Sequence, residues 1–522
     1  MRRIRLDRRR FLALAAGGGL GAGLLPAGRA TATAAENRIL RVQNDEDIEN
    51  LDPANRHGWY DELVMFAIYA GLCLYKPGKD WGWRLDAAET LTQTDPLTVE
   101  FVLRPGQQWT NGFGEVTADD VKYSYERFLD PRVHADYATD WEALDKVEVT
   151  GRYSGVIRLK HPFSPLFAST LPHASGLIVS RKAVEAIGGL IDTTPPATSG
   201  PYRIGQWIPR QRLVLVRHEL WNGPRPYYDE IQVLPMTQEE GETAFDAGDL
   251  DMTKIIISSI PVVVAAKDPG VTMTSMPALA YHWLGMNMTH PKLADLRVRR
   301  AIQHAVDVPA VLQATFGGMV PQAFGVVPTP LAGARTRNLY GYDPAESRRL
   351  LREAGVTGLE LRLDLGQNED HLTTAQVIQA QLAAVGIAVH IHTMDAASFI
   401  ALHENAQGDG WRDTQLHVHS ATTAPDASWV TPWFTCEQVG IWNFERFCDP
   451  QWDALSEQAV TELDPAKRAE TYVRLQDMLE ETGAYVFLFY GLNTWLTRAA
   501  LKGAWTPDGQ WPLLRDVAPA ES

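Results

Sequence analysis

The chain has 522 residues, of which 45% are hydrophobic and 21% are charged, and its formal net charge at pH 7 is −16. A chain of this length exceeds what one hydrophobic core usually serves, so we expect a globular protein of two or three domains. The excess of acidic residues excludes functions that depend on holding nucleic acid or an anionic membrane surface.

The first 34 residues have the pattern of a cleaved export signal. A twin-arginine sequence, DRRRFL at 7–12, precedes an apolar run over 12–25 and the small-residue sites of ATATA at 30–34. An uncleaved membrane anchor is the alternative, but about 14 apolar residues are fewer than the roughly 20 that span a bilayer. We therefore predict twin-arginine export and cleavage. Because no Cys lies near the cleavage region, the mature protein should be free in the periplasm, and losing seven Arg and one Asp changes its net charge from −16 to −22.

The mature chain begins with a predicted strand at 39–43 and a predicted amphipathic helix around 62–70. A second helix is predicted after Thr117, because Thr117 and Asp120 have the spacing of a capping box. Apolar side chains follow at helical spacing and predict its buried face: Val121, Tyr125 and Phe128.

Residues 198–231 predict a β-hairpin. Apolar and polar side chains alternate over 202–204 and again over 213–215, and Pro209 and Arg210 stand between the two runs. The segment therefore forms two antiparallel strands joined by a turn.

A βαβ unit is predicted further along the chain. Leucines alternate with charged residues over 359–365, apolar residues recur at helical spacing over 374–385, Gly386 ends that helix, and alternation returns over 387–391. In open parallel sheets, the loop at the carboxyl end of a strand borders the ligand crevice. That rule places the loop of Gln367 and Asn368 at a cleft, and an ordinary polar loop is the alternative.

The chain has three cysteines. Cys436 and Cys448 are twelve positions apart, and in an oxidising compartment they predict a disulfide. Cys73 lies inside an apolar run and is predicted to be a buried thiol.

The sequence contains no complete pattern that is typical of a catalytic site. His403 and Glu404 begin a zinc-protease motif, but Gln407 stands where the second His belongs. The sequence has no Gly-x-Ser-x-Gly elbow, Walker loop or Cys-x-x-Cys. The pairs His390-x-His392 and His417-x-His419 have a spacing that suits a metal, and the alternative is ordinary strand histidines. We predict no enzyme activity, no cofactor and no bound metal.

Several motifs resemble those of one family, the extracytoplasmic solute-binding proteins of peptide and nickel ABC importers. The longest is LRPGQQWTNGFGEVTADDVKYSYER at 103–127. Others are SGPY at 199–202, LWNGPRP at 220–226, DLRVRRAIQHAVD at 295–307 and YDP at 342–344. The resemblance covers roughly residues 38–500.

This resemblance implies an α/β protein with the two-lobed periplasmic binding protein fold and an additional intervening domain. The first lobe would comprise 36–72, 199–276 and 491–522. The intervening domain would comprise 73–198, and the second lobe 277–490.

The resemblance implies that the protein captures a small organic solute between two closing lobes and delivers it to an ABC permease complex in the inner membrane. We expect a monomer that performs no chemistry. The alternatives are a ligand receptor for a sensor or chemotaxis partner and a periplasmic enzyme. The residues expected to bind the ligand are His57, Trp59, Tyr60, Asn287, Gln367, Asn368, Thr423, Asp426 and Trp429.

The expected ligand is not an ordinary peptide held by its free amino terminus. Peptide-binding members of the family resemble one another in GWxADYxxPxxF, whose Asp pairs with the ligand's ammonium. Aligning HSATTAPDASW at 419–429 puts Ser420 at the Trp and Thr423 at that Asp, and a neutral hydroxyl cannot offset the desolvation of an ammonium. The alternative is that Asp426 takes over the role. Better candidates are opine-like or other modified amino-acid conjugates, or oligosaccharides stacking on Trp429, Trp433 and Trp442.

Overall fold

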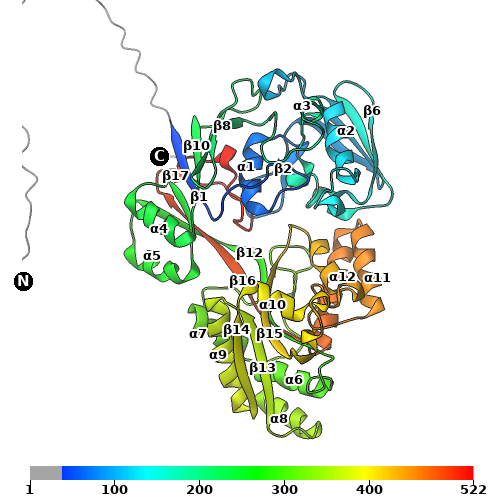
Figure 1. The fold of residues 1–522 in the computed structure, drawn as a ribbon, viewed down its shortest axis with the longest axis vertical. Helices are drawn as coiled ribbons and strands as arrows, with labels where there is room; N and C mark the ends of the chain where they lie inside the picture. The colour runs from blue at the N-terminus through cyan, green and yellow to red at the C-terminus, as the bar shows by residue number, and fades with distance from the viewer. Residues whose placement is uncertain (1–37, 521–522) are drawn as a thin grey trace, which may run out of the picture. The chain divides into compact units, whose positions relative to one another are not determined.

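Ten strands from both halves of the described residues, 38–520, join into one mixed sheet in the computed structural model (Figure 1). The predicted signal peptide, 1–34, lies outside these residues. In order across the sheet the strands are β14 (Ile387–Met394), β13 (Leu359–Gly366), β15 (Leu416–Thr422), β12 (Val271–Met286), β16 (Tyr485–Arg498), β11 (Met252–Ile255), β1 (Ile39–Asn44), β10 (Glu230–Pro235), β9 (Arg212–Arg217) and β8 (Tyr202–Ile208).

Two long antiparallel strands, β12 and β16, occupy the middle of this sheet and lie side by side (Figure 1). On one side, β16 pairs with β11, and on the other side β12 pairs with β15. The same two strands therefore connect the part of the sheet formed by 39–255 with the part formed by 359–422.

Four further strands form a separate antiparallel sheet in the order β4 (Ala88–Asp95), β5 (Thr98–Leu103), β7 (Ser154–Leu159) and β6 (Leu144–Val149). Two small pairs complete the strands of the described region: β2 (Cys73–Tyr75) with β3 (Trp83–Leu85), and β17 (Leu501–Lys502) with β18 (Ala518–Pro519).

The helices of residues 38–520 are α1 (Trp59–Ile68), α2 (Ala118–Glu126), α3 (Arg181–Ala186), α4 (Gln238–Ala247), α5 (Ile260–Ala266), α6 (Leu296–Ala305), α7 (Val308–Phe316), α8 (Pro344–Glu353), α9 (Glu369–Ala384), α10 (Ala396–His403), α11 (Pro450–Thr461) and α12 (Pro465–Glu481). Within the same range, no helix has the length and apolar character that crossing a membrane requires.

The predicted hairpin and βαβ unit are confirmed. β8 and β9 pair antiparallel around Arg210, whose φ of 61° suits a tight turn. β13 and β14 pair in parallel, with Leu359 opposite Ile387, and α9 connects them. The capping box at Thr117 is also confirmed, because its backbone N–H donates to the carboxylate of Asp120 over 2.9 Å.

Two helices begin earlier than the periodicity predicted. α9 begins at Glu369 because the side chain of Asn368 accepts a hydrogen bond from the backbone N–H of His371. The negative charges of the first turn also favour the helix start. α1 begins at Trp59, and its face is not amphipathic, because all residues from Asp61 to Ile68 are buried.

Buried apolar side chains gather in separate cores. One core comes from residues 279–490, a second mainly from 40–69, 202–252 and 495–517, and a third mainly from 70–197. The second and third cores interleave near the predicted boundary, since Leu74 belongs to the second and Leu72 to the third. The division into lobes and an intervening domain therefore stays a prediction.

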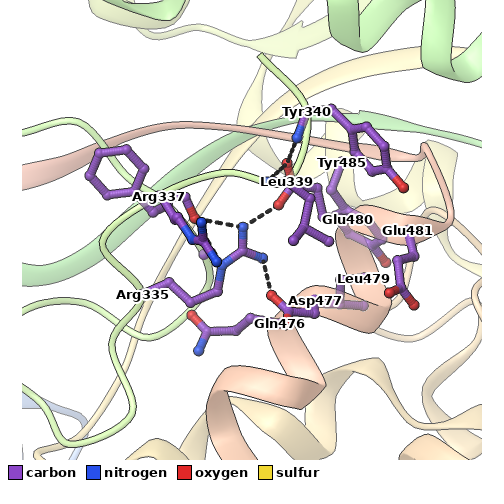
Figure 2. Close-up of polar contacts among 12 residues, drawn as sticks. Arg335, Arg337, Leu339, Tyr340, Gln476, Asp477, Leu479, Glu480, Glu481 and Tyr485 are labelled. Carbon is purple, nitrogen blue, oxygen red and sulfur yellow. Dashed lines mark hydrogen bonds and ion pairs between the residues drawn. The ribbon is translucent and has the colours of Figure 1, made fainter.

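A buried arginine anchors the irregular segment 317–343 to α12. Figure 2 shows the guanidinium of Arg335 between Asp477, 3.3 Å away, and Glu480, to which it also donates a hydrogen bond. Glu480 in turn accepts hydrogen bonds from the backbone N–H groups of Leu339 and Tyr340. These contacts satisfy a buried charge and fix a segment that has no regular structure of its own.

Candidate functional site

The register of the central strands brings together the carboxyl ends of strands from both halves of the sheet. β11 ends with Ile255 opposite Thr494 of β16, whereas β15 ends with Thr422 opposite Ala280 of β12. Between these positions β12 and β16 lose their regular register, at residues 277–281. The two sets of strand ends therefore approach the same place from opposite directions, and carboxyl ends are where open sheets bind ligands.

On the β11 side, a buried cation near the end of β11 contacts an aromatic pair at the start of α1. The rings of Trp59 and Tyr60 lie 4.0 Å apart, and the ammonium of Lys254 lies 4.8 Å from the centre of the Trp59 ring. Lys254 is also 3.6 Å from Asp45, and the Tyr60 hydroxyl donates to Glu46 over 2.9 Å. The sequence predicted the two aromatic residues but missed Lys254, because nothing local marks one lysine in a short strand.

Burial lowers the pKa of Lys254, although Asp45 and Asp508 act against that shift. Burial also raises the pKa of Asp508 to about 6. Asp508 accepts a hydrogen bond from the hydroxyl of Thr506 over 2.7 Å. This side of the site thus holds a cation and carboxylates in surroundings with little water, where a charged ligand group is bound strongly.

On the β15 side, the predicted polar residues lie next to the strand ends. Gln367 and Asn368 are exposed directly after β13, and Thr423 is half-buried directly after β15. The hydroxyl of Thr423 donates only to the carbonyl of Ala424, over 3.2 Å. A neutral hydroxyl therefore stands at the position that the alignment compares with an aspartate.

Two imidazoles, one from β12 and one from the first turn of α9, are in contact, a feature that the sequence did not reveal. Nδ1 of His282 lies 3.0 Å from Nε2 of His371. Burial lowers the pKa of His371 to about 4 and the pKa of His282 well below its usual value. Both rings are therefore neutral at physiological pH.

Asp426 does not present a free charge to this site. Its carboxylate accepts hydrogen bonds from both terminal nitrogens of Arg468, over 2.7 and 2.5 Å. It also accepts the backbone N–H of Ser428 over 2.9 Å, and its side chain is only 4% exposed. The alternative was that Asp426 pairs with the ammonium of a ligand. In this structure its carboxylate is already paired with Arg468.

Trp429 borders a pocket of about 350 Å³ between residues 139–170 and residues 428–460. Trp433 and Trp442 also line it, and their rings stack 5.6 Å apart. Trp442 is 46% exposed, so an aromatic face is open to a ligand. The three tryptophans that the sequence proposed as a stacking surface are thus close together.

A buried charge network continues from this pocket. Tyr137 lies 6.3 Å from Trp429, and the guanidinium of Arg56 lies 3.4 Å from the centre of the Tyr137 ring. Arg56 has no exposed side-chain surface and pairs with Glu62 at 2.5 Å. Glu62 lies 3.4 Å from His173. The Arg56 guanidinium packs on the Tyr137 ring, and pattern analysis does not detect these contacts because Tyr137 and His173 are distant from Arg56 and Glu62 in the sequence.

Two predicted ligand residues do not join the site. Asn287 is completely buried after the far end of β12, and its amide donates to the carbonyls of Trp411 and Thr414. Its side chain has no exposed surface in this structure. His57 is exposed and contacts Glu49, while its backbone N–H donates to Asp61.

Cys436 and Cys448 form a disulfide with Cα atoms 4.4 Å apart. Cys73 is a buried thiol whose pKa is raised by burial.

The histidines of the pair His417-x-His419 lie in different surroundings. His417 is buried against Glu445 at 2.8 Å, whereas His419 packs among aromatic rings such as Phe399 and Trp283. Across residues 38–520, no three His, Cys, Asp or Glu side chains are grouped in a way that could hold a metal ion.

Strand ends that face each other across two shared strands, with aromatic and polar side chains between them, define the two-lobed α/β fold of a solute-binding protein. The family model of the bacterial extracellular solute-binding proteins, family 5 Middle, matches residues 83–440. The chain therefore belongs to family 5 of these proteins. This family membership confirms the resemblance, and family 5 proteins are the extracytoplasmic solute-binding components of ABC importers.

Curated relatives agree with this assignment. The glutathione-binding protein GsiB of Escherichia coli O6:K15:H31 is 27% identical over 487 residues, which cover 89% of this chain and 92% of that protein. The GsiB protein of Salmonella paratyphi A is 26% identical over 467 residues, covering 87% and 89% of the two chains. Both relatives are named as binding proteins.

Solved structures share the fold. The substrate-binding protein CtaP of Listeria monocytogenes has a TM-score of 0.81 at 18% identity, covering 93% of this chain and all of that one. MoaA of A. tumefaciens R10, solved with mannopinic acid, has a TM-score of 0.74 at 24% identity, with 93% and 100% coverage.

Proposed function

We propose that this chain captures a peptide-like, opine-like or oligosaccharide solute at the facing strand ends and delivers it to an ABC permease complex in the inner membrane. The observation that carries the proposal is the approach of the carboxyl ends of β11 and β15 from opposite directions. Trp59 and Tyr60 would contact the solute from one side, and Thr423 from the other.

The protein reaches the periplasm through the twin-arginine signal at 1–34 and works there as a soluble monomer. The twin-arginine pattern of DRRRFL at 7–12 supports this location, and the acidic charge of the mature chain would keep it off anionic lipid.

The ligand is a modified amino-acid conjugate, an opine-like compound or an oligosaccharide, and not a peptide held by its free ammonium. Two observations support this choice: Thr423 offers only a neutral hydroxyl, and Asp426 is already paired with Arg468. The curated relatives are named for glutathione, a modified peptide, and glutathione is therefore included in the test below. The tryptophan pocket favours the oligosaccharide class.

A thermal-shift screen of the purified protein tests this proposal. The panel contains glutathione, opines, oligosaccharides, metal ions, di- to pentapeptides and the same peptides with acetylated amino termini. A ligand that binds only the folded state raises the melting temperature according to its saturation. We expect a shift of several degrees with a conjugate, opine or sugar. A comparable shift with unmodified peptides that acetylation abolishes would contradict the ligand class and restore the ordinary peptide.

A further inference from the structure

A second pocket lies at the amino end of β1, away from the facing strand ends. Arg38 precedes the first residue of β1, whereas the strand ends near Asp45 at the candidate site. The pocket has a volume of about 630 Å³, which is ample for a small molecule. Its charged lining comes from distant parts of the chain and comprises Arg38, Arg84, Arg104, Arg225, Arg515, Asp86 and Asp516.

The five arginines outnumber the two aspartates of this lining. Arg84 pairs with Asp516 at 2.5 Å, and Arg515 pairs with Asp86 at 2.8 Å. The partner of Arg38 is Asp229, which lies outside the lining and also contacts Arg217. In the described part of the chain, neither Arg104 nor Arg225 has a carboxylate partner. The pocket therefore keeps positive charge that the protein itself does not neutralise.

A buried donor adds a second, independent observation. The side chain of Arg515 is only 8% exposed, and its Nε has no hydrogen-bond partner within residues 38–520. Its two terminal nitrogens donate to Asp86 and to the carbonyl of Tyr69, which fixes the guanidinium at the wall of the pocket. Beside the pocket, burial together with Arg225 and Arg38 lowers the pKa of Arg217, as crowding of like charges requires.

We propose that this pocket binds a small soluble oxyanion, a phosphate or a polycarboxylate. Guanidinium groups match the geometry of both chemistries, because each can donate two parallel hydrogen bonds. Arg104 and Arg225 supply the positive charge that the carboxylates of the pocket leave unpaired, in a chain whose net charge is −16. Trp221 and Tyr227 add aromatic side chains to the lining of the pocket.

Isothermal titration of the purified protein with inorganic phosphate and with citrate tests the proposal. The test variant is Arg104→Glu/Arg225→Glu, which reverses the two unpartnered charges at exposed positions. The matched control is Arg132→Glu/Arg412→Glu, which makes the same charge change at exposed arginines outside the pocket. Melting temperatures verify that both variants fold. If the double charge reversal prevents folding, Arg225→Ala serves as the milder test variant.

We expect saturable binding of at least one probe, a loss of at least tenfold in affinity in the test variant, and less than twofold change in the control. Binding should weaken as NaCl is raised, since salt screens the attraction. The absence of binding by both probes at millimolar concentration overturns the proposal. So does equal weakening in the test and control variants, because that result reflects net charge and not a site.

Discussion

Asp426 and Arg468 form a bidentate ion pair across 42 residues of sequence, with side chains only 4% and 12% exposed. The geometry uses both carboxylate oxygens and both terminal nitrogens of the guanidinium. The pair places a neutralised group beside Thr423 and so shapes the charge of the candidate site.

We predict that Asp426→Asn destabilises the protein by about 3 kcal/mol, because it leaves a buried guanidinium without its partner. Ligand affinity, measured by titration once a ligand is known, should change less than threefold. The control is Asp409→Asn, which removes an exposed pair with Arg412 and should change stability by less than about 0.5 kcal/mol. A large loss of affinity with unchanged stability would show instead that Asp426 binds the ligand.

Trp59→Ala and Tyr60→Ala should each weaken ligand binding about tenfold, since each removes aromatic surface next to the strand ends. Titration calorimetry with the ligand found in the thermal-shift screen measures the effect. Tyr342→Ala is the matched control, because Tyr342 is an exposed aromatic residue elsewhere in the chain. Unchanged affinity in both test variants would remove these residues from the site.

Ligand binding should reduce the radius of gyration. β12 and β16 connect the two halves of the sheet, and their irregular register at 277–281 offers a place for bending. Small-angle scattering with and without saturating ligand measures the change. An unchanged radius at saturation would count against closure.

Replacing Cys436 and Cys448 together by Ser should destabilise the protein by about 3 kcal/mol, in the chain-entropy account of a loop of this size. Thermal unfolding with and without reductant checks the effect, and the reductant should no longer matter in the double variant. Cys73→Ser provides the control for reductant sensitivity, which it should retain. Mass spectrometry of the unreduced protein should find one free thiol, at Cys73.

Glu62 predicts a specific pH dependence. Burial alone would raise the pKa of Glu62, but His173 and Arg56 overcome this and lower it to about 2. Since the ordinary value in the unfolded chain is 4.5, the charged form stabilises the fold above pH 4.5, and this stabilisation is lost as the pH falls from 4.5 to 2.

Glu62→Gln should therefore cost on the order of a few kcal/mol at pH 7, and the difference from the original protein should shrink as the pH falls below 4.5. Melting temperatures between pH 7 and pH 3 test this prediction. Glu360→Gln, at an exposed position on β13, should show no such trend. A pH-independent difference for Glu62→Gln would mean that packing, and not charge, causes the loss.

The sequence by itself determined the local elements, the family and the fold class. Alternation of apolar residues predicts β8, β9, β13 and β14, and the spacing of Thr117 and Asp120 predicts the start of α2, because these patterns depend on neighbours within a few residues. Motif order was sufficient for family membership.

Only the tertiary structure decided which candidate side chains are available to a ligand. Asn287 was an expected ligand residue, yet its amide bonds to carbonyls more than 100 positions away in sequence. Lys254 lies over Trp59 because β11 and β1 are neighbours in the sheet, and Asp426 is paired because α12 brings Arg468 to it. Partners of this kind depend on strand order and helix packing, which bring together residues whose local sequence patterns are independent of one another.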